Sequence, residues 1–86
     1  MIIEVIVVDD PPTTRMGLHL LLDLTPDVHV VGEAECGIKA LEMVSTLKPD
    51  ILLLDFCLPD MSGPQVSAEV QKLNLRTRVL GFSAFS

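Results

Sequence analysis

The residues best suited to chemistry are carboxylates that stand directly after apolar runs. Asp55 follows the four apolar residues at 51–54. Asp9 and Asp10 follow the largely apolar run at 4–8. Short apolar runs bounded by turn residues are typical of strands buried on both faces. Ligands bind at the carboxyl ends of strands in open α/β sheets, so Asp55 is the first candidate for a reactive residue.

A cluster of these carboxylates would favour the binding of a hard cation. Like charges a few ångströms apart raise pKa values unless a cation neutralises them. Mg²⁺ takes oxygen ligands, and a carboxylate beside it can attack a phosphoryl group to give an aspartyl phosphate. The hydroxyl of Ser83 could donate a hydrogen bond to that group, and the small Ala84 leaves space for it. Asp55, Asp9 and Asp10 could therefore form one site that binds Mg²⁺, and a carboxylate there could also accept a phosphoryl group.

Each of these residues also has an ordinary structural explanation. Asp55 could simply open a turn, and Asp9 and Asp10 could cap the start of a helix. Ser83 could be a turn hydroxyl, and the acidic composition could aid solubility. Such explanations are favoured for each residue taken alone. The occurrence of these residues together at three predicted strand ends favours one shared site.

Alternating strands and helices are predicted to position these residues. Helices begin near Pro12, Ile38 and Gly63, where turn residues precede apolar side chains at helical spacing. The order β-α-β-α-β-α-β implies a parallel sheet with right-handed crossovers, which brings the carboxyl ends of its strands to one edge. The predicted strands span residues 4–8, 28–33, 51–54 and 78–83.

The first predicted helix lies between Pro12 and the helix-breaking Pro26. Apolar side chains recur along it at intervals of four residues, with Leu21 beside them. We expect this stripe to cover one face of the sheet. It consists of Met16, Leu20 and Leu24.

Composition limits the classes of protein to which the chain can belong. Its 86 residues suffice for one small domain, and a hydrophobic content of 49% favours a sheet covered on both faces. Its net charge of −6 argues against direct binding of nucleic acid or anionic membranes. No segment reaches the length of a membrane span, and no basic leader precedes the first apolar residues. Cys36 and Cys57 lack CxxC spacing, so we expect reduced thiols in a cytoplasmic protein.

Two common kinds of site do not fit the sequence pattern. The place of a glycine-rich phosphate-binding loop after the first strand is taken by the segment Asp9-Asp10-Pro11-Pro12. No Ser/His/Asp or Cys/His arrangement stands at the predicted strand ends. Dinucleotide-binding, P-loop and triad-hydrolase functions are therefore disfavoured.

The ordered combination of motifs resembles the receiver domain of two-component response regulators over the whole chain, residues 1–86. Each motif is weak alone, but their order and spacing are highly specific. Two further segments resemble the NarL/FixJ/LuxR-type subfamily, whose receivers precede a LuxR-type helix-turn-helix DNA-binding domain. The receiver motifs are Val7-Val8-Asp9-Asp10, Leu53-Leu54-Asp55 with Leu58-Pro59 and Gly63, and Ser83-Ala84; the subfamily segments are Arg15-Met16-Gly17-Leu18 and residues 30–34.

The resemblance implies a flavodoxin-like α/β fold with helices on both faces of a parallel sheet. The implied strand order is 2-1-3-4, with the strands numbered along the chain. Such a domain is a phosphoacceptor switch and not an enzyme, apart from its own phosphotransfer and autodephosphorylation. It would control transcription only through a DNA-binding output domain that this chain lacks.

The resemblance also implies roles for individual residues. Asp55 would accept a phosphoryl group from the phosphohistidine of a sensor histidine kinase. Mg²⁺ would be bound by Asp10, Asp55 and the backbone carbonyl of Cys57, with Asp9 acting mostly through water. Ser83 would turn towards the phosphoryl group and help to switch the distal surface. Asp60 matches a variable loop position and receives no role.

The chain departs from the family pattern at its end. It stops before the fifth strand and fifth helix, and the lysine that follows the fifth strand has no counterpart. Pro11 replaces the histidine common in the subfamily. The strand at 78–83 would be an unpaired edge with apolar area uncovered, so we expect the ordered part of a longer protein or a fragment that self-associates. The lysines that remain, Lys39, Lys48 and Lys72, lie on the predicted helices.

Two other functions stay open. A phosphatase of the haloacid-dehalogenase type also uses an aspartyl phosphate, but it requires Asp-x-Asp after the first strand, where this chain has Asp9-Asp10-Pro11. A phosphorylation-incompetent interaction module is suggested by the missing lysine. Turnover of a phosphate ester without a kinase would favour the phosphatase. Folded protein that never gains a phosphoryl group would favour the interaction module.

Overall fold

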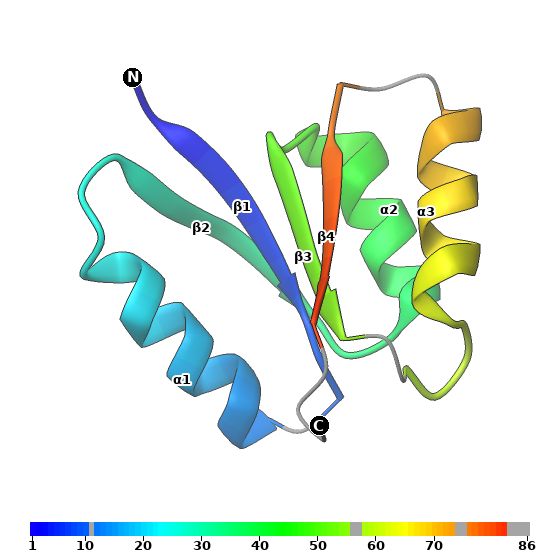
Figure 1. The fold of residues 1–86 in the computed structure, drawn as a ribbon, viewed down its shortest axis with the longest axis horizontal. Helices are drawn as coiled ribbons and strands as arrows, with labels where there is room; N and C mark the ends of the chain where they lie inside the picture. The colour runs from blue at the N-terminus through cyan, green and yellow to red at the C-terminus, as the bar shows by residue number, and fades with distance from the viewer. Residues whose placement is uncertain (11, 56–57, 74–75, 83–86) are drawn as a thin grey trace.

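The computed structural model describes residues 1–10, 12–55, 58–73 and 76–82. Strands and helices alternate along these residues, as the sequence pattern predicts. Figure 1 shows a central sheet with α1 on one face and α2 and α3 on the other. The elements are β1 (Ile3–Val8), α1 (Pro12–Asp23), β2 (Val28–Ala34), α2 (Gly37–Leu47), β3 (Ile51–Asp55), α3 (Gly63–Lys72) and β4 (Arg78–Phe82).

The sheet is parallel, and its strands lie in the order β2-β1-β3-β4. In the register of β1 and β3, Val5 pairs with Ile51 and Val8 pairs with Leu54. At the end of β3, Asp55 pairs with Phe82 of β4. The fold class and strand order expected from the resemblance are confirmed. All four strands therefore end at the same edge of the sheet, where the acidic residues stand.

Apolar side chains cover both faces of the central strands. The last four residues of β1 are all buried, because successive side chains of a strand point to opposite faces and each face meets a helical layer. The continuous apolar runs in the sequence thus reflect burial on two sides. The α2–α3 side holds Ile6, Val8, Ala34, Ala40, Val44, Leu52, Leu54, Val66 and Val70, and the α1 side holds Val5, Val7 and Val30, with Leu18 and Leu22 partly buried against them.

The first helix meets the sheet with a different stripe from the predicted one. Leu18 and Leu22, one turn apart, pack against the cluster formed by β1 and β2. Apolar residues occupy most positions between 16 and 24, so their spacing fits several faces of a helix and does not select one. The predicted stripe is wrong: Met16, Leu20, Leu21 and Leu24 are between 62% and 84% exposed.

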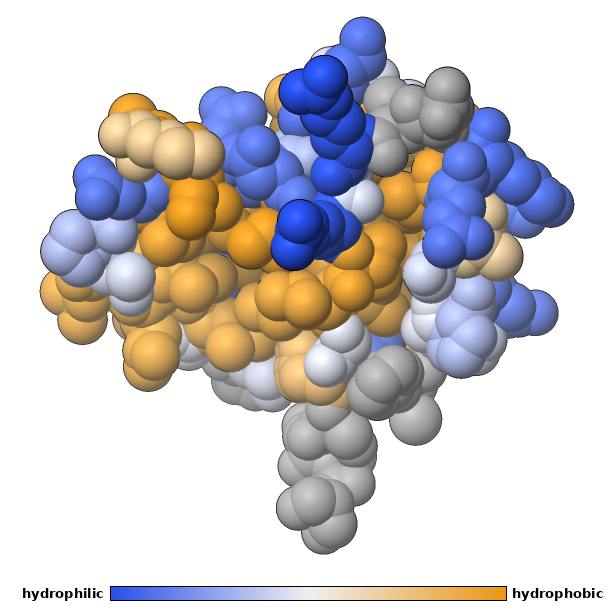
Figure 2. All heavy atoms as spheres, turned by 45° about the horizontal axis from the view of Figure 1, so that its top comes forward, coloured by the Kyte–Doolittle hydropathy of each residue, from blue (hydrophilic) through white to orange (hydrophobic). Residues whose placement is uncertain are grey.

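Apolar side chains also reach the surface outside α1. Leu80 of β4 is half exposed, and β4 lies at an edge of the described sheet. Figure 2 shows a broad apolar area on one face of the molecule, crossed by hydrophilic side chains. This matches the expectation that the fourth strand forms an edge with apolar area left uncovered. None of the described helices is long and apolar enough to cross a membrane.

Candidate functional site

Two acidic residues lie where the carboxyl ends of β1 and β3 meet. Asp9 directly follows β1, and its backbone N–H donates to the carbonyl of Ala34 at the end of β2, over 3.0 Å. Asp55 is the last residue of β3. Both side chains are buried: Asp9 is fully enclosed and Asp55 is 6% exposed. The parallel topology brings these two carboxylates together, as predicted from their positions after the strands.

The Asp9 carboxylate is completely buried. Neither of its oxygens has a hydrogen-bond partner among the described residues. Burial, and after it the neighbouring Asp55 carboxylate, raises the pKa of Asp9 from 3.8 to about 6, although the Arg15 charge acts in the opposite direction. A buried carboxylate of this kind is stabilised by a proton or by a cation. The oxygen donors and their negative charge fit a hard divalent cation such as Mg²⁺.

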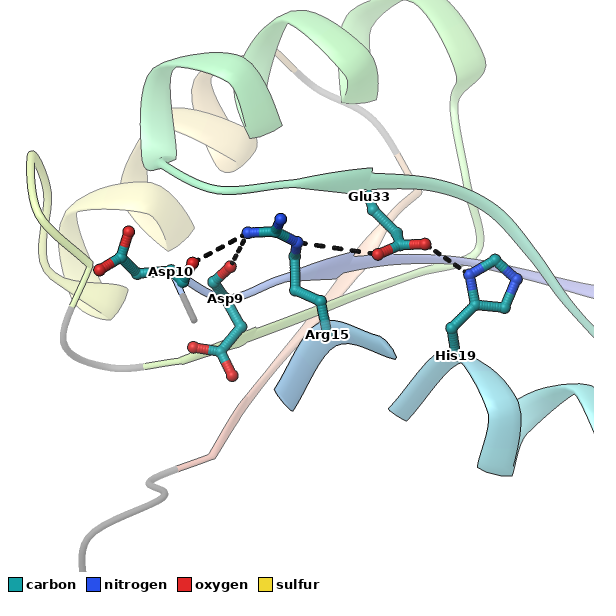
Figure 3. A network of polar contacts seen from close by, with 5 residues as sticks. All are labelled: Asp9, Asp10, Arg15, His19 and Glu33. Carbon is teal, nitrogen blue, oxygen red and sulfur yellow. Dashed lines mark hydrogen bonds and ion pairs between the residues drawn. The ribbon is translucent and has the colours of Figure 1, made fainter. Parts of the chain in front are cut away.

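Asp10 is placed differently from its neighbour. Its side chain is exposed, and in Figure 3 its carboxylate points away from that of Asp9. Within the described residues, no three His, Cys, Asp or Glu side chains are gathered closely enough to hold a metal ion. The structure therefore brings Asp9 and Asp55 together and leaves Asp10 at the surface. The assignment of all three as Mg²⁺ ligands stays a prediction.

Two of the predicted site residues, Cys57 and Ser83, lie outside the described residues. The role of the Cys57 carbonyl as a Mg²⁺ ligand and that of the Ser83 hydroxyl as a donor to a phosphoryl group stay predictions. The strand end that precedes Ser83 is described, and Phe82 pairs there with Asp55. Residue 83 therefore follows in sequence directly after the partner of the candidate phosphoacceptor.

Asp60 has a structural role that the sequence analysis missed. Its carboxylate oxygens accept hydrogen bonds from the first two backbone N–H groups of α2, at 2.7 Å from Gly37 and 2.9 Å from Ile38. These bonds hold the pKa of Asp60 below its ordinary value. Cys36, the residue that precedes α2, makes no side-chain cap. Asp60 caps the helix instead, although it lies 23 residues after Gly37 and 22 residues after Ile38. The loop that follows Asp55 is thus tied to the start of α2.

Met61 adds a packing contact to this tie. A Cβ atom built on Gly37 would lie 2.8 Å from the Met61 sulfur and 2.9 Å from its Cβ, so glycine allows the loop to approach α2. At the other end of the loop, Ser62 caps α3 by accepting from the N–H of Gln65, whose side chain accepts in return from the Ser62 N–H. No local sequence signal could reveal the tie to α2, because its partners lie far apart in the chain.

A chain of polar contacts connects the acidic edge to β2 and α1 (Figure 3). Arg15 Nη1 donates to the backbone carbonyls of Asp9 and Asp10, over 2.7 and 3.0 Å. Arg15 Nε lies 3.7 Å from Oε1 of Glu33, and Oε2 of Glu33 lies 2.6 Å from Nδ1 of His19. In the sequence, Arg15 is part of a subfamily motif, and that motif does not predict these contacts.

Comparison with known proteins assigns the arrangement to a family. The family described as response regulator receiver domain matches residues 5–86. The transcriptional regulatory protein NarL of Mycobacterium tuberculosis is 46% identical over 82 residues, which are 95% of this chain and 38% of that protein. The nitrate/nitrite response regulator protein NarL of Escherichia coli is 35% identical over 79 residues, which are 92% of this chain and 37% of that protein.

Solved structures show the same likeness. The signal receiver domain of the response regulator NarL from Mycobacterium tuberculosis superposes with a TM-score of 0.93 at 45% identity, covering 99% of this chain and 68% of that one. The chain spans less than two-fifths of the length of the NarL proteins it matches. A family match over nearly the whole chain, a shared sheet order and a buried acidic strand end agree with one another. The chain belongs to the response regulator receiver domain family of two-component signalling, and its relatives include NarL-type transcription regulators.

Proposed function

We propose that the chain acts as a phosphorylation switch in which Asp55 accepts a phosphoryl group from a sensor histidine kinase. The proposal is supported by the closeness of Asp55, at the carboxyl end of β3, to the Asp9 carboxylate, which is buried and accepts no hydrogen bond from the described residues. An acidic pair of this kind needs positive charge before it can receive a phosphoryl group. Membership in the response regulator receiver domain family supports this proposal.

The chemical step uses the Asp55 carboxylate as a nucleophile. A carboxylate oxygen of Asp55 attacks phosphorus, and the phosphorus–nitrogen bond of the kinase phosphohistidine breaks with its electron pair remaining on the imidazole. Mg²⁺, when bound, would neutralise charge that accumulates on the transferring group. Asp9, Asp10, Asp55 and the backbone carbonyl of Cys57 would hold it, with Asp9 acting mostly through water. Ser83 would donate a hydrogen bond to a phosphoryl oxygen after transfer.

The protonation state of Asp9 limits the conditions for this switch. Because the pKa of Asp9 is raised to about 6, the carboxylate is mostly ionised at pH 7 and above and mostly protonated below pH 5. Protons and Mg²⁺ would therefore compete for the site in acid. Phosphoryl transfer should proceed at neutral pH and weaken as the pH falls through 6.

The partners follow from the same proposal. As a receiver domain the chain is a regulatory switch, and it would reach DNA only through an output domain outside this sequence, since its relatives are transcription regulators. Uncovered apolar side chains such as Leu80 would be buried by further parts of a longer protein or by self-association. We place the protein in the cytoplasm, together with the catalytic part of its kinase.

Intact-mass measurement after incubation with acetyl phosphate tests the proposal. The wild-type chain should gain one phosphoryl group with Mg²⁺ and none without it, and Asp55→Asn should gain none. Asp27→Asn is a matched control, because it makes the same change at an exposed aspartate before β2. Circular dichroism should show that each variant is folded. A folded wild-type chain that gains nothing, or an adduct that persists in Asp55→Asn, would contradict the proposal and favour an interaction module or another acceptor.

A further inference from the structure

Arg15 lies at the acidic edge but has no part in the mechanism above. We propose that Arg15 is a positioning residue: its guanidinium fixes the backbone after β1 and so sets where the carboxylates of Asp9 and Asp10 meet a cation. This inference rests on the proposed function of that edge as a Mg²⁺-dependent phosphoryl acceptor. It requires no contact between Arg15 and the cation or the phosphoryl group.

The contacts of Arg15 restrain two successive peptide groups. Its Nη1 nitrogen donates to the carbonyl of Asp9 over 2.7 Å and to that of Asp10 over 3.0 Å. The first carbonyl belongs to the peptide group before Asp10 and the second to the one after it. Because peptide groups are planar, holding both of them fixes the two backbone dihedral angles of Asp10 and the direction of its Cβ. Figure 3 shows the guanidinium lying against this turn of the chain.

The restrained stretch lies between regular elements. β1 ends at Val8 and α1 begins at Pro12, and the carbonyls of Asp9 and Asp10 between them both accept from the Arg15 side chain. The carboxylates of Asp9 and Asp55 lie close together and repel each other. The positively charged Arg15 side chain therefore restrains the backbone where this repulsion would otherwise displace it.

Glu33, which is itself in contact with His19, lies against Arg15 on the side opposite the carbonyls. Arg15 Nε lies 3.7 Å from Glu33 Oε1, and the Arg15 side chain is only 18% exposed. The second oxygen of Glu33 lies 2.6 Å from His19 Nδ1, so Glu33 joins β2 to two turns of α1. Arginine can donate to the carbonyls from one nitrogen and form an ion pair with Glu33 through another, whereas lysine has only one ammonium group.

The sign of the effect on cation binding separates positioning from simple electrostatics. Arg15 carries a positive charge close to Asp9, so its removal alone should make the edge more negative and tighten Mg²⁺ binding. Loss of a restraint on the backbone should weaken binding instead. Groups that orient metal ligands typically change metal affinity by about 10- to 100-fold when they are removed. The inference predicts weaker Mg²⁺ binding in spite of the lost positive charge.

Titration calorimetry with Mg²⁺ on folded variants tests this sign. Arg15→Met should raise the Mg²⁺ dissociation constant by about tenfold, and Arg15→Lys should raise it less. Arg78→Met is the matched control, because it removes the same charge from an exposed residue at the start of β4. This residue lies at the opposite end of the strands from the acidic residues, so the change should not weaken binding. Saturating Mg²⁺ should restore the phosphorylation rate with acetyl phosphate. Binding as tight as wild type in Arg15→Met and Arg15→Lys would overturn the inference; if Arg15→Met does not fold, Arg15→Lys decides.

Failure of the proposed function would be seen separately. A wild-type chain that binds Mg²⁺ but gains no phosphoryl group would remove the acceptor function and leave the positioning role standing. The NMR order parameter of the Asp10 amide, which belongs to the first of the two restrained peptide groups, tests the restraint directly when it is measured without Mg²⁺. It should fall in Arg15→Met and stay unchanged in Arg78→Met. An unchanged value in Arg15→Met would overturn the inference whatever the phosphorylation result.

Discussion

Replacement of Asp9 by asparagine should stabilise the fold at neutral pH, because it removes a buried charge and keeps the shape of the side chain. The pKa of Asp9 rises from 3.8 to about 6 on folding, chiefly through burial and then through the neighbouring Asp55 carboxylate. Each pKa unit corresponds to about 1.4 kcal/mol, so ionised Asp9 lowers the free energy of unfolding by about 3 kcal/mol. Asparagine carries no charge and should avoid this loss.

The direction of the pH dependence follows from proton binding. Between pH 3.8 and about 6 the folded state retains the Asp9 proton, whereas the unfolded chain has released it. The unfolded state binds fewer protons in this window, so the free energy of unfolding falls as the pH rises. Below pH 3.8 both states are protonated and the loss disappears. Above pH 6 the full loss of about 3 kcal/mol is present.

Urea unfolding followed by far-ultraviolet circular dichroism measures this difference. The chain has no tryptophan or tyrosine, so backbone dichroism is a better probe than fluorescence. Asp9→Asn should exceed wild type by about 3 kcal/mol at pH 7.5 and by little at pH 4. Asp10→Asn makes the same change at an exposed side chain and should have a much smaller effect. Mg²⁺ should raise the stability of wild type at pH 7.5 more than that of Asp9→Asn.

Two results would refute the reasoning. Equal stability of Asp9→Asn and wild type at pH 7.5 would mean that the buried carboxylate has a partner or lies in water. A gain in stability that is the same at pH 4 and pH 7.5 would mean that the substitution acts through packing and not through charge.

Three further predictions test the structure around the site. Asp60→Ala should lower the free energy of unfolding, because the start of α2 loses its cap; an unchanged urea midpoint would contradict the tie. An NMR titration should place the pKa of His19 above 6.5, since Glu33 accepts a hydrogen bond from its ring, and Glu33→Gln should lower it. The stabilisation from that pair should be present below pH 6.5 and fade as the pH rises through the His19 pKa; a titration that Glu33→Gln leaves unchanged would exclude the contact. Leu22→Ala should destabilise the fold by about 1–2 kcal/mol and Leu20→Ala by about 0.5 kcal/mol or less. A larger loss for Leu20→Ala in urea unfolding would mean that α1 packs on the sheet through the stripe predicted from the sequence.

Most of the fold could be predicted because burial on two faces leaves a strong sequence pattern. The runs that form β1 and β3 are almost wholly apolar, and helices between them force parallel strands. The orientation of α1 could not be predicted in this way. Leu18 and Leu22 face the sheet and Leu20 faces solvent, although all three are leucines on one helix. Only the position of the sheet selects among such stripes.

The site was predictable to a similar extent. The meeting of Asp9 and Asp55 follows from topology alone, because parallel strands end at one edge. The outward direction of the Asp10 side chain could not be predicted, because it depends on the turn that Arg15 holds. The bond of Asp60 to the start of α2 joins segments more than twenty residues apart. Contacts of this range leave no local pattern in a sequence.

The most direct test of the central claim is to locate the phosphoryl group within the chain. The wild-type chain would be treated with acetyl phosphate and Mg²⁺, reduced with borohydride to convert an aspartyl phosphate to homoserine, and mapped by peptide mass spectrometry. Homoserine at position 55 and at no other aspartate is the predicted result. Homoserine at position 9 or 10, or none in a folded chain that binds Mg²⁺, would contradict the assignment of Asp55 as the phosphoacceptor.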